Sequence, residues 1–139
     1  MNQILNRFSD LVARHGLYIS SQAILQTCII ALDGINRKMI VQHSDGSHCI
    51  IDLDEVLSCS VIKQYGSIYG GDLKTRQLDQ YLQKVLLCFH FKTGKPPVEI
   101  PFYQHNADPI VLATERENKA KDWEAVLSKM LWRPVRKIA

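Results

Sequence analysis

The stretch from Cys28 to Tyr65 constrains the fold more than any other part of the chain, because apolar runs alternate there with two turn sequences. The turns, Asp33-Gly34-Ile35-Asn36 and Ser44-Asp45-Gly46-Ser47, contain residues that tolerate positive φ or bond their own backbone. β-Branched and aliphatic residues crowd the segments beside them. The pattern predicts an antiparallel meander of four strands, at residues 23–32, 38–43, 48–53 and 56–65.

A second, smaller sheet is predicted after a long loop that contains adjacent glycines. Residues 81–92 alternate, and the face that we expect to be the core carries Val85, Leu87, Phe89 and Phe91. Residues 98–104 supply the partner strand, in which Pro101 favours an edge position or a bulge because proline cannot donate to a ladder. The loop, residues 66–80, has room for a short strand at 67–69, and the sequence leaves open whether it is functional or disordered.

An amphipathic helix is predicted at each end of the chain. Residues 2–15 place apolar side chains at spacings of one, three and four, and Gly16 is a natural stop. This helix is expected to close the open end of the sheet, and the alternatives are a dimerisation helix or a membrane-surface helix. Thr114 and Glu117 fit a capping box for the second helix, whose apolar stripe is Ala120, Trp123, Val126, Leu127, Met130 and Leu131.

Length and charge predict one soluble domain with a nearly neutral body. A chain of 139 residues with 46% apolar side chains can bury a single core. It has 17 basic and 14 acidic side chains, and the excess lies beyond the last acid, at Arg133, Arg136 and Lys137. Because nucleic-acid affinity needs many phosphates neutralised together, no nucleic-acid partner is expected.

The four cysteines, Cys28, Cys49, Cys59 and Cys88, fall singly inside apolar segments and never form a close sequence pair. This pattern is typical of free core thiols, and no secretory leader precedes them, so we expect a reducing cytoplasm. The longest apolar run, residues 28–32, is far shorter than the ~20 residues of a membrane-spanning helix. The sequence contains no phosphate-loop or cofactor motif, and no cofactor is predicted.

Two segments carry a family resemblance. Ile30-Ala31-Leu32-Asp33, leading into Arg37-Lys38-Met39-Ile40-Val41, forms an aspartate, turn, lysine and aliphatic hairpin, and IDLDEVLSCSV follows from Ile51 to Val61. Both are similar to segments of the small bacterial pleckstrin-homology-like (PH-like) domains, and the resemblance covers residues 23–132. It implies an α+β fold, a split β-barrel of two antiparallel sheets with a C-terminal capping helix. This chain adds an N-terminal helix.

With the helix predicted from periodicity, the chain is expected to divide into an N-terminal amphipathic helix at residues 1–16, a PH-like domain at 17–132 and a short basic tail at 133–139. Trp123, Leu127 and Met130 are expected to cap the mouth of the barrel. The family implies a binding or scaffolding module without catalysis. Only Arg37 and Lys38 match the basic cluster of its phosphoinositide-binding members, so a phosphoinositide is not the expected ligand.

The histidines and cysteines are the candidate residues for a metal site or for a nucleophile with its base. Zinc needs three or four convergent ligands, so we expect partly exposed side chains rather than a metal site at His43, His48, His90 and His105. A nucleophile and base pair of Cys59 or Cys88 with His90 needs a stabilised thiolate, whereas strand positions favour core packing.

One local patch combines basic and aromatic side chains, namely Lys63, Tyr65, Tyr69, Lys74 and Arg76. Such a patch is usually a solvated rim, and it is the candidate docking site for an acidic peptide or a phosphate group. The unpaired edges of the split barrel are another candidate, because an extended peptide can add a strand there.

The predicted function is non-enzymatic recognition or scaffolding in a bacterial cytoplasm. The expected partner is an unknown protein or peptide, and the sequence leaves a homodimer open. One alternative is a lipid or membrane-surface module that uses the N-terminal helix and the basic tail. The other is a small thiol or metal enzyme.

Overall fold

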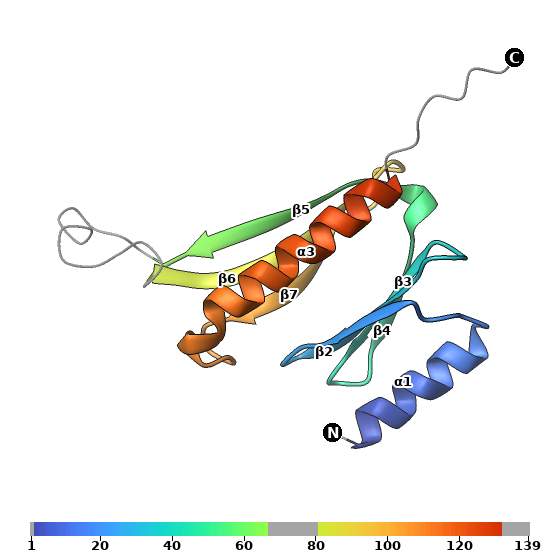
Figure 1. Cartoon of the computed structure of the whole chain (residues 1–139), viewed down its shortest axis with the longest axis horizontal. Coiled ribbons are helices and arrows are strands. Elements are labelled where there is room, and N and C mark those ends of the chain that lie inside the picture. Colours follow the sequence, from blue (N-terminus) through green and yellow to red (C-terminus); the bar gives the residue numbers. More distant parts are fainter. Residues whose placement is uncertain (1, 67–80, 132–139) are drawn as a thin grey trace, which may run out of the picture. The chain divides into compact units, whose positions relative to one another are not determined.

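The computed structural model describes residues 2–66 and 81–131, and these residues form an α+β structure (Figure 1). The chain divides into two compact units, Met1–Val56 and Leu57–Ala139. The first unit contains helix α1 and a four-stranded sheet, and the second contains a three-stranded sheet and helix α3. Among the described residues, no helix has the length and apolar character needed to cross a membrane.

The first sheet is an antiparallel meander, as the turn sequences predicted. Its strands, in spatial order, are β1 (Ser21–Ile24), β2 (Cys28–Asp33), β3 (Lys38–His43) and β4 (His48–Asp52). The register places Ile30 opposite Val41 and Leu32 opposite Met39, which confirms the expected pairing across the first turn. In the second turn Asp45 accepts bonds from the N–H and hydroxyl of Ser47 at 2.8 and 2.6 Å.

The prediction of one strand at residues 23–32 was wrong, because a turn divides this run into β1 and β2. The N–H of Leu25 donates to the carbonyl of Cys28 at 2.8 Å, and the two strands then pair with Ile24 opposite Ile29. The turn contains Gln26 and Thr27 and has no glycine, proline, asparagine or aspartate. Without those residues the sequence carries no turn signal at this point.

The prediction that residues 56–65 continue the first sheet was also wrong, because β5 (Val56–Tyr65) belongs to the second sheet. The expected corner at Asp54-Glu55 is present as a 3-10 turn, η1 (Leu53–Glu55). The Arg37 guanidinium donates to Asp54 at 2.8 Å, and the N–H of Leu53 donates to the carbonyl of Arg37 at 2.9 Å. These bonds hold the corner against the β2–β3 turn, so the chain leaves β4 without forming another hairpin.

Asp33 joins the β2–β3 turn to the segment that follows α1. Its carboxylate accepts the N–H groups of Tyr18, Ile35 and Asn36 at 2.9, 3.0 and 2.9 Å. The side-chain amide of Asn36 also donates to it, at 2.7 Å. Burial alone raises the pKa of the Asp33 carboxyl, but the hydrogen bonds from Asn36, Tyr18 and Ile35 outweigh burial and hold that pKa below its usual value.

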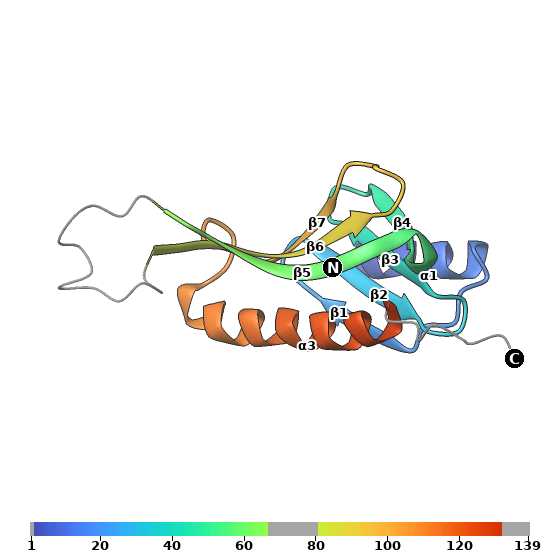
Figure 2. The ribbon, with the colours of Figure 1, turned by 90° about the horizontal axis from the view of Figure 1, so that it is seen from above.

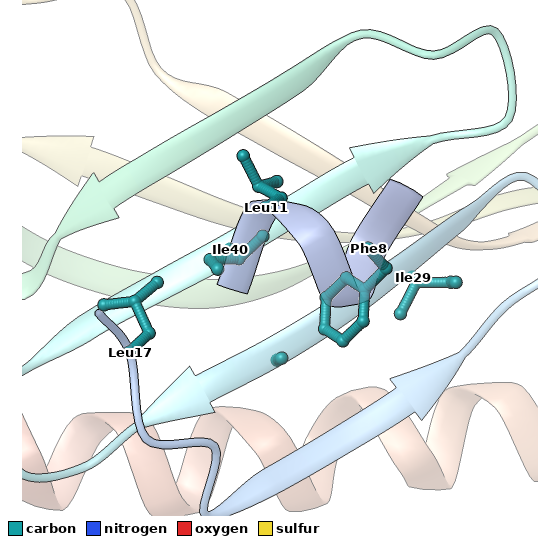
Figure 3. Packing of buried hydrophobic residues seen from close by; sticks show 6 residues of the cluster. Phe8, Leu11, Leu17, Ile29 and Ile40 are labelled. Carbon is teal, nitrogen blue, oxygen red and sulfur yellow. The ribbon is translucent and has the colours of Figure 1, made fainter. Parts of the chain in front are cut away.

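Helix α1 (Asn2–Arg14) lies with its apolar face on the first sheet, and its predicted end at Gly16 is confirmed by a left-handed φ of 62°. Figure 3 shows Phe8 and Leu11 packed with side chains of β2 and β3. The buried cluster consists of Phe8, Leu11, Leu17, Ile29, Ala31 and Ile40. The face of the helix that the sequence marked as apolar is therefore occupied by the sheet.

The second sheet has the order β5-β6-β7, with β6 (Leu82–Phe91) between β5 and β7 (Val98–Gln104). Helix α3 (Ala113–Leu131) packs along β6 and β7, as Figure 2 shows. Pro101 lies on the edge strand β7 beside a bulge, where Val85 pairs with Tyr103 and Leu86 with Pro101. Both expectations for Pro101 are thereby confirmed.

Two expectations for the last helix need correction. A 3-10 turn, η3 (Ile110–Leu112), runs directly into α3, so Thr114 lies inside the helix and is not its cap. Val126, expected on the apolar stripe, is 49% exposed, whereas Trp123 and Met130 are half-buried and Leu127 is fully buried. The described strands form two sheets and no closed barrel, and capping by Trp123, Leu127 and Met130 stays a prediction.

Two glutamates of α3 bind β5, which with β7 is one of the two edge strands of its sheet. Glu124 accepts the N–H of Val61 at 2.7 Å. Glu117, two turns earlier on the helix, accepts bonds from the ammonium groups of Lys63 and Lys121 at 2.9 and 2.8 Å. Helix α3 is thereby tied by side chains to β5 and packed on the other two strands.

Replacing Asp33 by alanine is expected to lower the free energy of unfolding by about 2 kcal/mol at neutral pH, because several N–H groups lose their acceptor. A carboxyl whose pKa is lowered by folding stabilises above its unfolded pKa, and this stabilisation is lost as pH falls through the folded pKa. The difference between variant and parent should therefore shrink below pH ~4. Urea titrations across this range measure it, and a difference independent of pH would contradict the assignment.

Replacing Glu124 by alanine is expected to lower the free energy of unfolding by about 1–2 kcal/mol, because the N–H of Val61 loses its acceptor. Asp122→Ala is the matched control, since Asp122 is an exposed carboxylate on the same helix, and its effect should stay within about 0.5 kcal/mol. Urea denaturation compares the two variants. Equal losses would show that the bond to β5 contributes nothing.

Candidate functional site

A groove of about 300 Å³ lies in the first unit, where α1 crosses the β3–β4 hairpin. Helix α1 contributes Arg7, Asp10, Leu11 and Arg14 to its lining, and the hairpin contributes Gln42, Gly46 and His48. Its volume is at the lower end of the roughly 300–1,000 Å³ of ligand pockets. All of these residues belong to one compact unit.

Periodicity brings these side chains to one place. Arg7, Asp10 and Arg14 are three and four residues apart, so they share one face of α1 beside the buried apolar face. On the sheet, Gln42 of β3 pairs directly with His48 of β4, so the two side chains lie next to each other. Ile40, two residues before Gln42, belongs to the core under α1, which places Gln42 on the helix-facing side of the sheet.

Gly46 makes room for Arg7 at one end of the groove. Its φ is +95°, and a Cβ placed on it would lie 2.8 Å from Nη1 of Arg7. Glycine adopts this backbone conformation readily, and it alone adds no atom where the guanidinium lies. The guanidinium of Arg7 thus lies directly over the glycine of the β3–β4 turn.

The groove has two positive charges with no ionic partner in the described part of the chain. Neither Arg7 nor Arg14 forms an ion pair with a described residue, although Asp10 lies between them on the helix. Gln42 is only 3% exposed, and its Oε1 has no hydrogen-bond donor among the described residues. An unsatisfied buried acceptor is costly, so a ligand with an N–H or O–H donor would be stabilised there.

Two histidine rings meet near the groove. The rings of His15 and His48 have centroids 6.3 Å apart and are tilted by 56°. The sequence did not indicate this contact, because the two residues lie far apart along the chain. His43 is half-buried and His48, His90 and His105 are exposed, which agrees with the expectation of partly exposed histidines.

The basic and aromatic patch is only partly described. Tyr69, Lys74 and Arg76 lie outside the described residues. Lys63 is ion-paired with Glu117, and its ammonium lies 5.7 Å from the centroid of the Tyr65 ring. The hydrogen bond to Glu117, and then that to Tyr65, raises the pKa of Lys63. The charge of Lys63 is thus engaged within the unit, and the patch stays a prediction.

The cysteines are free thiols in a protonated state. Cys28, Cys59 and Cys88 are buried and Cys49 is half-buried, which confirms core thiols for the first three. Burial raises the pKa of Cys28 to about 11, against a smaller opposing effect of Thr27. Burial, followed by the charges of Glu124 and Cys88, raises that of Cys59 to about 12. Burial also raises the pKa of Cys49 and of Cys88, the latter with help from Glu99.

Cys88 and His90, considered as a nucleophile and base pair and judged less favourable than core packing, do lie close together, with Sγ and Nε2 3.6 Å apart. Residues two apart on a strand share a face, which accounts for the approach. The raised pKa of Cys88 opposes thiolate formation at this position. Among the described residues no group of three or more histidine, cysteine or acidic side chains is placed to hold a metal ion.

A second hollow, of about 290 Å³, lies in the second unit. It is lined by Leu57, Ser58 and Cys59 of β5 and by Ser128 and Leu131 of α3. None of these described lining residues is charged, and Leu57 is 64% exposed. Its few polar groups are serine hydroxyls and a protonated thiol, so it offers less for specific recognition than the groove.

Arg7, Asp10 and Arg14 lie on the polar side of the amphipathic helix that the sequence predicts, but the sequence alone does not join them into a site. The one local signal for the groove is Gln42, a polar residue in the otherwise apolar strand 39–42, and no prediction above rests on it. A polar side chain on a core face indicates either an internal hydrogen bond or a ligand. Only the packing of α1 beside β3 distinguishes these two outcomes.

None of the protein-family models, curated proteins or solved structures compared with the chain matches it. The PH-like family therefore stays a prediction. What the groove binds follows from the chemistry of its own residues.

Native thiols are expected to react slowly with iodoacetamide at mildly alkaline pH. A pKa of about 11 for Cys28 and about 12 for Cys59 leaves few thiolates, so Cys28 should react about a hundredfold and Cys59 about a thousandfold more slowly than in the unfolded chain. Cys49, which is half-buried, should be the fastest of the four. Mass spectrometry of timed digests measures the rates. A thiol that reacts faster in the native than in the unfolded chain would instead indicate an activated nucleophile.

Proposed function

We propose that this chain is a non-catalytic binding module, and that it holds an anionic group of its partner in the groove between α1 and the β3–β4 hairpin. One observation carries the proposal: two arginines without ionic partners among the described residues line the groove, beside a buried glutamine oxygen that has no donor. Charge-assisted hydrogen bonds from arginine to carboxylate or phosphate are the strong ones available to such a site.

The PH-like family is retained as part of this proposal. Two antiparallel sheets, a corner between them and a C-terminal helix support it. Binding modules of one fold differ in their ligands, so the groove rather than the fold decides what is bound. A protein or peptide partner is proposed in preference to a nucleic acid or a phosphoinositide, and a homodimer stays open.

The lipid-binding alternative receives less support. A membrane-surface helix inserts its apolar face into the bilayer, whereas Phe8 and Leu11 of α1 are buried against the sheet. Membrane insertion would require α1 to leave the sheet and expose this cluster. The basic tail at 133–139, on which the alternative also depends, lies outside the described residues.

The enzyme alternative lacks an activated group among the described residues. Burial raises the pKa of the thiol groups, and the described histidines do not converge with other metal ligands. A small thiol or metal enzyme needs one or the other. Binding without catalysis is therefore the function that the geometry supports best.

Binding is tested with hexaglutamate and inorganic phosphate as probes, followed by amide chemical shifts of the ¹⁵N-labelled chain at low salt. Both probes should shift resonances of α1 and the β3–β4 hairpin. The double change Arg7→Gln and Arg14→Gln should weaken hexaglutamate binding at least tenfold, about 1.4 kcal/mol or more. Lys92→Gln removes one exposed charge that does not line the groove, and it should change little. No shift with either probe would reject the proposal.

A further inference from the structure

We infer that the partner group is an extended acidic segment of a protein, with two carboxylates about 10 Å apart on either side of a hydrogen-bond donor. The inference rests on the proposed function, because it specifies what the same groove takes. Three features of the groove carry it: the separation of the arginines, the carboxylate between them and the buried acceptor of Gln42.

The separation of Arg7 and Arg14 favours two anionic groups over one. Seven residues of α-helix rise about 10.5 Å, so the two Cα atoms lie two turns apart on one face. Arg7 is directed to the turn end of the groove, where its Nη1 occupies the space over Gly46. An anion bound to Arg7 in this position lies at one end of the groove, so a second anionic group beside Arg14 would use both arginines.

Asp10 gives the helix face an alternating order of charge, positive, negative and positive from Arg7 to Arg14. A ligand that is uniformly negative would place charge against Asp10, and like charges at close range are destabilising. A donor between two acids would bind there instead. A peptide provides this order, because its backbone N–H groups lie between its acidic side chains.

The buried oxygen of Gln42 also favours a ligand with a hydrogen-bond donor between its acidic groups. Its buried Oε1 is an acceptor, and it needs an N–H or O–H group rather than another anion. A carboxylate ion has acceptors only and cannot satisfy this oxygen. Inorganic phosphate keeps an O–H donor near neutral pH, but it is one compact anion and not two carboxylates on either side of a donor. A peptide N–H can satisfy it while the acidic side chains on either side bind the arginines.

The spacing suits an extended chain in the polyproline II conformation. This conformation rises about 3.1 Å per residue with three residues per turn, so residues three apart face the same way about 9.3 Å apart. Two glutamates separated by two residues therefore match the separation of the arginines. Adjacent glutamates point in different directions and cannot reach both.

The experiment compares three labelled peptides by fluorescence anisotropy on the full chain. The first contains Glu-Ala-Ala-Glu within a glycine and serine sequence, the second contains Ala-Glu-Glu-Ala in the same setting, and the third replaces both glutamates of the first by glutamine. The spaced peptide should bind at least tenfold tighter than the adjacent one, and the glutamine peptide should not bind. Arg7→Gln and Arg14→Gln should each remove the preference for spacing, whereas Lys92→Gln should keep it.

Inorganic phosphate and vesicles that contain phosphatidylserine serve as competing probes. If phosphate or hexaglutamate binds but the spaced and adjacent peptides bind equally, the groove is a simple anion site and the inference fails while the proposed function stands. Tighter binding to the vesicles than to the spaced peptide at equal salt also overturns the inference. If no probe binds the parent chain, the proposed function fails as well.

Discussion

The burial of the apolar face of α1 on the four-stranded sheet is the interaction on which the first unit depends. Phe8 and Leu11 enter a cluster with Ile29 and Ile40, and this contact fixes the helix over β2 and β3. One helix backbone carries both the apolar face and the polar face beside it. Packing of the apolar face on the sheet therefore also places Arg7, Asp10 and Arg14 beside the hairpin. The same contact removes the apolar surface that a membrane-binding helix would use.

In each unit, hydrogen bonds to buried or half-buried carboxylates connect elements that also pack through apolar contacts. Asp33 binds the N–H of Tyr18 and so ties the exit of α1 to the β2–β3 turn. In the second unit Glu124 binds the N–H of Val61 on the edge strand β5. Hydrogen bonds to charged acceptors are directional and strong, so each of them selects one placement among several that would bury similar area. Arg7 and Arg14 in the groove differ from these carboxylates, because neither arginine forms an ion pair with a described residue.

The sequence predicted the elements that have a local pattern of alternation or turn residues. It did not predict those that depend on contacts between residues far apart in the chain. Alternation and Gly-containing turns identified β2, β3, β4 and β6, and the position of Pro101 at a bulge followed from its missing N–H. The turn at Gln26-Thr27 carries no breaker residue, so the strand there could not be divided from sequence alone. The pairing of β5 in the second sheet and the bonds of Arg37 at the corner join residues far apart in the chain, so local patterns do not reveal them. For the same reason the groove was not predicted, because Gln42 becomes part of a site only when α1 packs beside β3.

The charge order of the groove also separates the classes of partner that a positively charged site usually attracts. Nucleic acid presents evenly repeated phosphates, and its affinity grows with the number of cations that it meets. Here Asp10 interrupts the two arginines, so an evenly negative backbone would meet repulsion at the centre of the contact. A protein segment can place a donor at that point, because its charges are set residue by residue. On this proposal Asp10 weakens the binding of a uniformly negative ligand, while the two arginines favour acidic groups placed on either side of it.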